Sequence, residues 1–245
     1  MSQTNDNLVL LVGKAANGKS ASLRNIKNPE GVLYLNCEAG KKLPFRSKFI
    51  ERVITDPIKH IPQMFTAAES KPEIHTIVVD SLTYLLDMYE SKYVLTLANK
   101  MEGWSNFAQF FKYLMQDLVA KSTKNVIFTA HVKDDVTDEM VRETSVPVKG
   151  SLKNNGIESY FSCVIAAKKK KLTDLEEYKS SLLTITPQEE ALGFKYVFQT
   201  MITKDTVNER LRGPMGLFAA NETFIDNDMQ LVLDRLHEYY GDATT

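Results

Sequence analysis

Near the start of the chain, two glycines, a lysine and a serine stand at a spacing that suits phosphate binding. Gly13, Gly18, Lys19 and Ser20 fit the pattern G-x-x-x-x-G-K-[ST], between an apolar run and a helical pattern. Glycines let the backbone wrap tightly and turn its N–H groups toward phosphate oxygens. The ammonium group of Lys19 suits β- and γ-phosphates, and the Ser20 hydroxyl suits Mg²⁺. The spacing therefore predicts a loop that binds ATP, with Mg²⁺ as cofactor.

A second oxygen ligand for Mg²⁺ is expected at the end of another strand. Asp80 ends the apolar run "HTIVVD", and ligands bind at the carboxyl edge of open parallel sheets. We therefore predict Ser20 and Asp80 as the metal residues, with helix capping as the alternative role of Asp80. The residues expected to contact the nucleotide are Gly13, Lys14, Ala15, Ala16, Asn17, Gly18, Lys19, Ser20 and Ala21.

The acid that activates the attacking water is expected away from Asp80. Many P-loop ATPases carry a glutamate directly after this aspartate, but Ser81 stands there. Glu38, which follows the run "VLYLNC", is the best candidate for the general base, with a solvated turn acid as the alternative. His131 ends "VIFTAH" and is expected to sense the γ-phosphate, unless it is only a loop residue. Lys19, Glu38 and His131 are the predicted catalytic residues.

Strand-like runs alternate with helical patterns through the first half of the chain. Strands are expected at Leu8 to Val12, Gly31 to Glu38, His75 to Asp80 and Asn125 to His131, with a short one in "FIERVIT". Helices are expected at Ser20 to Ile26, in "KHIPQMFTAAES", from Leu82 to about Lys100, and in "SNFAQFFKYLMQDLVAKS" after a break at Gly103 and Trp104. The order predicts an α/β fold with a mostly parallel central sheet flanked by helices on both faces.

The second half begins with a polar segment that is expected to form a loop or hairpin. Further strands are expected in "YFSCVIAAKKKK" and "FKYVFQTMIT", and the helix "MQLVLDRLHEYYG" ends the chain. No linker-like segment interrupts the pattern, which favours one domain over residues 1–245.

The composition is that of an ordinary globular chain, with 245 residues, 43% of them hydrophobic, and a net charge of -1. Any affinity for nucleic acid must therefore come from local patches. Cys37 and Cys163 lie in apolar runs and are expected to be reduced and structural. No apolar run approaches the ~20 residues that cross a membrane, and the N-terminus has no signal core, so we expect a cytoplasmic protein without membrane contact.

Together these segments resemble the RecA-type ATPase core, and most of all its compact phage-encoded branch of single-strand annealing proteins with a short AAA-type ATP-binding domain. The similarity rests on "GKAANGKS", "LYLNCEAG", "IVVDSLTYL", "GW" before a long helix, and "VIFTAH", over about residues 8 to 132. It implies a single RecA-like P-loop ATPase domain, residues 1–245, and the same roles for Glu38, Asp80 and His131. It also implies single-strand annealing or strand exchange in phage recombination, in the host cytoplasm.

The resemblance further implies two kinds of partner. A DNA-binding loop would follow the sensor at about Asp134 to Gly156, with Lys149 and Lys153, so single-stranded DNA is an expected partner. Self-association as a ring or filament is also expected. Because only about seven residues precede the first strand, we do not expect docking through an N-terminal segment. RecA-like subunits insert basic residues into a neighbour's ATP site. The candidates here are Lys204, Arg210 and Arg212, with solvated surface charge as the alternative.

Lysines 168–171 form a run of four after an apolar strand. They could neutralise DNA phosphates, but protection of a sheet edge is the favoured role. Two other functions fit the sequence. One is a small-molecule or nucleotide kinase, which would need an arginine-bearing lid. The other is a nucleotide-gated replication accessory, similar to a helicase loader, without strong ATPase activity.

Overall fold

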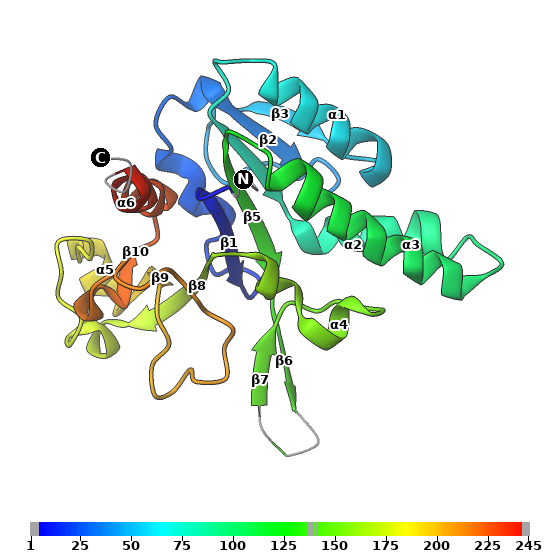
Figure 1. Ribbon diagram of the computed structural model, residues 1–245. Helices are drawn as coiled ribbons and strands as arrows, with labels where there is room; N and C mark the ends of the chain where they lie inside the picture. The colour runs from blue at the N-terminus through cyan, green and yellow to red at the C-terminus, as the bar shows by residue number, and fades with distance from the viewer. Residues whose placement is uncertain (1–4, 137–139, 141, 242–245) are drawn as a thin grey trace.

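The computed structural model has a central sheet with helices on both of its faces (Figure 1). It describes residues 5–136, 140 and 142–241. The strands are β1 Leu8–Gly13, β2 Val32–Asn36, β3 Ile50–Val53, β4 Thr76–Asp80, β5 Asn125–His131, β6 Lys133–Val136, β7 Arg142–Ser145, β8 Cys163–Lys171, β9 Phe194–Gln199 and β10 Phe224–Asp226. The α-helices are α1 Pro57–Glu69, α2 Leu82–Tyr89, α3 Lys100–Tyr113, α4 Leu152–Asn155, α5 Pro187–Leu192 and α6 Met229–Gly241.

Shorter helical segments complete the described chain. The 3₁₀ helices are Ser20–Asn25, Pro29–Gly31, Ile157–Tyr160, Leu172–Leu175 and Ala220–Glu222. Two π-helical segments, Glu90–Val94 and Leu114–Val119, continue α2 and α3. No described helix is long and apolar enough to cross a membrane.

The sheet brings the predicted site residues to one edge. Its strand order is β10-β9-β8-β1-β5-β4-β2-β3, and every pair from β8 to β3 is parallel, while β8–β9 and β9–β10 are antiparallel. Gly13 is paired in register with His131, and Asn36 with Asp80. The carboxyl ends of β1, β5, β4 and β2 therefore lie side by side. The predicted α/β fold with a mostly parallel sheet is confirmed.

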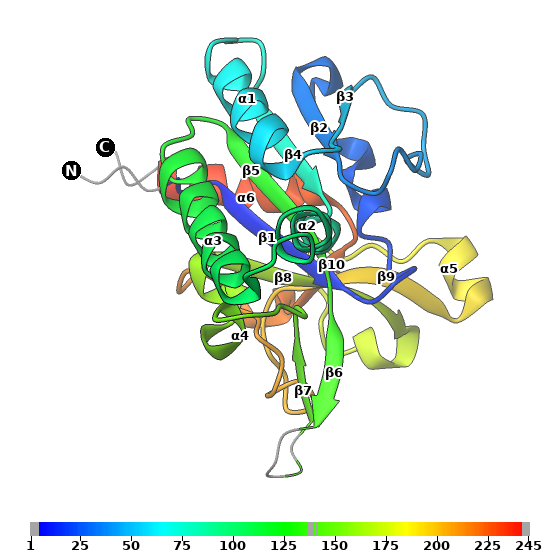
Figure 2. The same cartoon turned by 90° about the vertical axis from the view of Figure 1, so that its right-hand side faces the viewer.

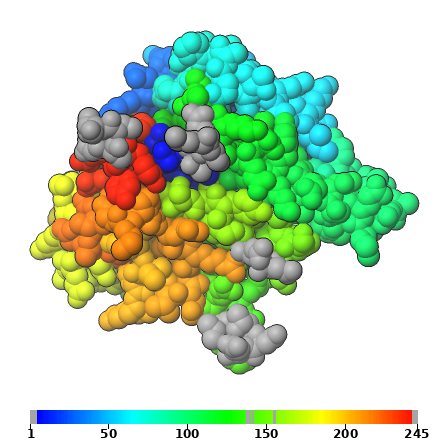
Figure 3. Space-filling view, in the orientation of Figure 1, coloured from blue at the N-terminus to red at the C-terminus, as the bar shows by residue number. Residues whose placement is uncertain are grey.

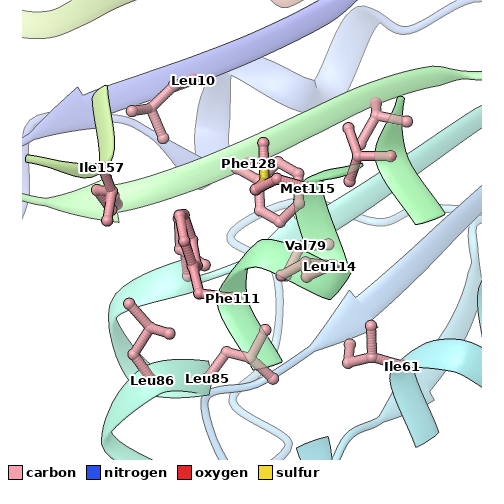
Figure 4. Packing of buried hydrophobic residues seen from close by; sticks show 14 of the residues in the cluster. Leu10, Ile61, Val79, Leu85, Leu86, Phe111, Leu114, Met115, Phe128 and Ile157 are labelled. Atoms are coloured by element: carbon pink, nitrogen blue, oxygen red, sulfur yellow. The ribbon is translucent and has the colours of Figure 1, made fainter. Parts of the chain in front are cut away.

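Both faces of the sheet are buried, because alternate residues of each strand point to opposite sides. On β1, Leu8 and Leu10 belong to a core cluster with residues of α1, α2 and α3, whereas Val9 and Leu11 belong to a second cluster with residues of α6. Figure 4 shows the first cluster, in which side chains from the helices and from β1, β4 and β5 gather together. Continuous apolar runs such as "LVLLV" follow from this double burial.

The expected helix break at Gly103 and Trp104 is wrong. Both residues lie inside α3, and the break falls at residues 95–99. The side chain of Asn99 caps α3 by accepting a hydrogen bond from the backbone N–H of Glu102. Gly103 is needed for close packing, since a Cβ atom there would lie 3.1 Å from the Cα atom of Val94.

The helix expected after the phosphate-binding loop is a six-residue 3₁₀ helix, Ser20–Asn25. Its shortness leaves little aligned dipole, so the predicted phosphate binding would depend on the loop's own N–H groups and on Lys19. Cys37 and Cys163 are buried and free, as expected.

Lysines 168–171 form the last part of β8, beyond the residues of β8 that pair with β1. β8 pairs with β1 only as far as Ala166, and lysines 168–171 pair with β9 alone. Lys169 lies over the rings of Phe194 and Tyr196. Lys168 also forms an ion pair with Glu209 at 2.5 Å, so edge protection stays a prediction for the other three lysines.

A two-stranded hairpin, β6 and β7, projects from the carboxyl end of β5 (Figures 1 and 2). It confirms the hairpin expected in the polar segment. Residues 137–139 and 141, which belong to the predicted DNA-binding loop, lie outside the described residues.

Candidate nucleotide-binding and catalytic site

The phosphate-binding loop follows β1 and is shaped around the ammonium group of Lys19. Lys19 Nζ donates hydrogen bonds to the carbonyl oxygens of Gly13, at 2.9 Å, and Lys14, at 3.1 Å. Gly18 has a φ of 85°, which a glycine adopts without strain. At Gly13 the loop approaches β8 so closely that a Cβ atom would lie 2.8 Å from the carbonyl oxygen of Ala167. The glycines therefore make room for a compact loop with a cation at its centre.

A pocket of about 940 Å³ opens beside this loop. Residues 15–21 line it, whereas Gly13 and Lys14 line a neighbouring pocket of about 660 Å³. Glu38, Asp80 and His131 line the larger pocket as well. The structure thus brings the predicted catalytic and metal residues together with most of the loop.

Asp80 is buried at the end of β4 and is held by three hydroxyl groups. Ser20 Oγ and Tyr34 Oη each donate to Asp80 Oδ2 at 2.8 Å, and Thr129 Oγ1 donates to Oδ1. Burial, followed by the charge of Asp80 and its hydrogen bond, raises the pKa of the Tyr34 hydroxyl far above its usual range. Tyr34 is therefore neutral and acts as a donor that orients the carboxylate.

Ser20 and Asp80 fit Mg²⁺ by the chemistry of their donors, because this ion prefers oxygen ligands and usually retains water and substrate phosphates. Among the described residues, no group of three or more His, Cys, Asp or Glu side chains could hold a metal ion. Ser20 and Asp80 would hold the ion together with the phosphates of a bound nucleotide.

Glu38 follows β2 and is fixed by the loop that leads away from it. The backbone N–H of Glu38 donates to Asn36 Oδ1 at 3.0 Å, and the amide of Asn36 donates to the carbonyl oxygen of Lys41 at 2.9 Å. Lys41 Nζ lies 2.8 Å from Glu38 Oε2. Burial raises the pKa of Glu38, but Lys41 and then His131 outweigh it, so the pKa is below its usual value. Glu38 is therefore ionised at neutral pH, as a general base must be.

His131 lies between Lys19 and Glu38. Its Nδ1 atom is 3.4 Å from Lys19 Nζ, and its Nε2 atom is 3.6 Å from Glu38 Oε1. The backbone N–H of His131 donates to Thr83 Oγ1 at 2.9 Å, which ties the end of β5 to α2. Burial and the charge of Lys19 lower the pKa of His131, and Glu38 opposes them. The ring is therefore mainly neutral at pH 7, and its buried Nε2 atom makes no hydrogen bond.

Lys19 has a lowered pKa of about 8, because burial of its ammonium group outweighs the attraction of Asp80 and Glu38. Only 7% of the residue is exposed. A nearby triphosphate would favour the charged form.

The predicted DNA-binding lysines lie away from this pocket. Lys149 Nζ forms an ion pair with Glu90 at 2.7 Å, whereas Lys153 is exposed. Both line a separate pocket of about 930 Å³ beside the β6–β7 hairpin. The hairpin is joined to the phosphate-binding loop, because Lys14 Nζ lies 2.6 Å from Asp134 Oδ2 on β6.

The basic residues predicted to act in a neighbouring subunit differ in their surroundings. Arg210 pairs within the chain with Glu143, at 2.8 Å, and Glu158, at 3.3 Å. Lys204 and Arg212 are exposed. None of the three lines the pocket beside the loop, but Arg210 lines the neighbouring pocket of about 660 Å³ together with Gly13 and Lys14.

Sequence reasoning missed Tyr34, Thr129 and Lys41. Thr129 stands two residues before His131 on β5, and the period of two along a strand gives both the same face. This signal could have identified Thr129. Tyr34 and Lys41 carry no comparable signal, since an aromatic residue in a strand and a lysine in a turn are ordinary at those places.

The comparison with known families agrees with this geometry. The family described as AAA domain matches residues 5–194, a range that contains the loop, Glu38, Asp80 and His131. No curated protein matches the chain. Because the match covers well over half of the 245 residues, the chain belongs to the AAA domain family and has a nucleotide-binding P-loop ATPase domain.

Proposed function

We propose that the protein is a Mg²⁺-dependent ATPase of the RecA-like type that acts on single-stranded DNA, in strand annealing or exchange during phage recombination. The observation that carries the ATPase part is the row formed by Lys19, His131 and Glu38. The imidazole ring of His131 lies between the ammonium group of Lys19, at 3.4 Å, and the ionised carboxylate of Glu38, at 3.6 Å.

This row suits hydrolysis of a γ-phosphate. Glu38 accepts a proton from a water molecule, whose oxygen forms a bond to the γ-phosphorus while the bond to the β–γ bridging oxygen breaks. The products are ADP and inorganic phosphate. Lys19 stabilises the charge that develops on the phosphoryl oxygens, and His131 contacts them as a sensor. Mg²⁺ held by Ser20 and Asp80 would neutralise phosphate charge and position the β- and γ-phosphates.

Action on DNA is supported by the place of the hairpin. β6 begins at Lys133, two residues after His131, so a shift of the sensor on hydrolysis reaches the hairpin directly. The Lys14–Asp134 ion pair gives a second link between loop and hairpin. Lys153 is the better of the two predicted DNA contacts, because the charge of Lys149 is already paired with Glu90.

Self-association is supported by the surface of residues 200–216. This segment, in orange, occupies the lower part of the face in Figure 3. It carries the exposed residues Lys204 and Arg212, which suit insertion into a neighbouring subunit. Arg210 suits this role less well, because its guanidinium group is held by two carboxylates.

The test is the rate of ATP hydrolysis with and without single-stranded DNA, alongside the molecular mass in solution with ATP present. We expect DNA to stimulate turnover and ATP to increase the mass. Turnover that responds only to a small phosphate acceptor would identify a kinase instead. Nucleotide binding without turnover in either condition would identify a nucleotide-gated accessory protein.

A further inference from the structure

Asn227 lies in the turn between β10 and α6, at the pocket that contains the phosphate-binding loop. Only 5% of the residue is exposed. Its side-chain amide packs against the loop, since a Cβ atom on Gly18 would lie 3.2 Å from Asn227 Oδ1 and 3.4 Å from Nδ2. The carbonyl oxygen of Asn227 accepts a hydrogen bond from Arg24 Nη1 at 3.0 Å, which fixes the turn to the 3₁₀ helix after the loop.

The amide of Asn227 has no partner in the described part of the chain, and its Nδ2 atom is buried. Its two neighbours differ in this respect. Asp226 accepts a hydrogen bond from the backbone N–H of Thr184, and Asp228 accepts one from Asn25 Nδ2. Because an unpaired buried amide is costly, such a group calls for a ligand or another specific reason.

The sheet order indicates which part of a nucleotide comes near Asn227. β5, β4 and β2, which provide His131, Asp80 and Glu38, lie on one side of β1, while β9 and β10 lie on the other. The pocket spans both sides, and Asn227 and Tyr196 line its β9–β10 side. With the γ-phosphate at His131 and Glu38, the opposite end of the nucleotide extends toward Asn227.

We propose that the side-chain amide of Asn227 hydrogen-bonds the nucleoside part of the bound nucleotide, its sugar or base, and so selects nucleotides over a bare triphosphate. This inference rests on the proposed function, because it places the γ-phosphate at the catalytic residues. A neutral amide both donates and accepts hydrogen bonds, which suits hydroxyl groups and ring nitrogens. The phosphates would be bound by the phosphate-binding loop and Lys19, not by Asn227.

The experiment compares the Kd of ATP, 2′-deoxy-ATP, GTP and inorganic triphosphate for the wild type and Asn227→Leu, which keeps the branching of the side chain and removes its polar atoms. We expect the Kd of ATP to rise about three- to tenfold in the variant, while the Kd of inorganic triphosphate stays unchanged. If the variant raises the Kd of ATP and GTP but not that of 2′-deoxy-ATP, the partner of Asn227 is the 2′-hydroxyl group of the sugar. If it raises the Kd of ATP and 2′-deoxy-ATP but not that of GTP, the partner is the base.

Asn227→Ser serves if the leucine variant does not fold, and Asn221→Leu, on an exposed asparagine outside the pocket, is the matched control. Equal weakening of ATP and triphosphate, or an unchanged Kd for ATP in either Asn227 variant, would overturn the inference. Equal affinity of the wild type for ATP and inorganic triphosphate would refute the role of Asn227 but would not contradict the proposed ATPase function. A wild type that binds neither ligand would instead refute the proposed function.

Discussion

Ser20 Oγ donates a 2.8 Å hydrogen bond to Asp80 Oδ2, and so joins the end of the phosphate-binding loop to the carboxyl end of β4. β5 lies between β4 and β1, the strand that leads into the loop, so the contact reaches across one strand of the sheet. Thr129, from that intervening strand, donates to the other oxygen of the same carboxylate. The two metal-ligand candidates are therefore in position before a nucleotide binds.

Asp80→Asn is expected to separate hydrolysis from folding. An amide of the same shape keeps part of the hydroxyl network but loses the charge that attracts Mg²⁺, so Mg²⁺-dependent turnover should fall by roughly a hundredfold or more. Nucleotide binding measured in EDTA should change little. Tyr34→Phe is the control, because it removes one hydrogen-bond donor from the carboxylate but keeps the charge of Asp80. It should lower the free energy of unfolding by about 1 kcal/mol. Full turnover in Asp80→Asn would exclude a metal role for this residue.

ATP affinity is expected to weaken as the pH rises above about 8, because Lys19 has a pKa of about 8. Below that pH the ammonium group is charged and attracts the phosphates, and above it the charge is lost. Nucleotide binding should therefore be coupled to uptake of a proton above pH 8. Titrations between pH 7 and 9.5 test this, with Lys19→Met as a control that should bind weakly at every pH. A flat affinity profile in the wild type would show that Lys19 stays charged.

Lys41→Ala is expected to raise the pKa of Glu38, because Lys41 supplies the largest effect that lowers it. A base with a higher pKa is protonated at higher pH, so the acidic limb of the kcat profile should move upward. Lys42→Ala removes a nearby exposed charge that pairs with Glu51 instead, at 3.7 Å, and should leave the limb in place. Identical profiles for the wild type and both variants would mean that Glu38 does not set this limb.

Gly13→Ala is expected to destabilise the protein and to weaken nucleotide binding. Its Cβ atom would meet the backbone oxygen of Ala167 at 2.8 Å, and relief of this contact must move β1 or β8, at a cost of about 1–3 kcal/mol in unfolding free energy. Gly213→Ala is the matched control, since its nearest neighbour is Leu217 Cδ2 at 3.8 Å. Denaturant unfolding of the two variants measures the difference, and equal stability would contradict the close approach of loop and β8.

Lys153→Ala is expected to weaken binding of single-stranded DNA uniformly across sequences and to reduce the dependence of log K on log salt by about 0.7. Lys149→Ala should have a smaller effect, because Glu90 already neutralises Lys149. Binding titrations at several salt concentrations give both quantities. An unchanged salt dependence in Lys153→Ala would remove this lysine from the DNA surface.

Much of the fold follows from the sequence because the parallel strands are buried on both faces. The expected strand Asn125 to His131 coincides with β5, and such strands appear as uninterrupted apolar runs bounded by polar residues. The break between α2 and α3 was misplaced because glycine weakens a helix in general, whereas Gly103 serves a contact with Val94 that only the tertiary structure shows.

The site was predictable where a residue ends a strand. Glu38, Asp80 and His131 follow apolar runs, and parallel strands place such residues at one edge. Asn227 and Lys41 were not predictable in this way. Asn227 comes to Gly18 from the far end of the chain, through the packing of α6 beside the 3₁₀ helix Ser20–Asn25. Lys41 reaches Glu38 through a local turn whose shape depends on the side chain of Asn36.

The role of Glu38 as general base is tested by Glu38→Gln. ATP affinity and single-turnover hydrolysis are measured on the same preparations of the wild type and the variant. Because glutamine keeps the size of the side chain but accepts no proton, we expect an unchanged Kd for ATP and a hydrolysis rate lower by roughly a hundredfold or more. Hydrolysis at the wild-type rate in Glu38→Gln would show that Glu38 is not the general base.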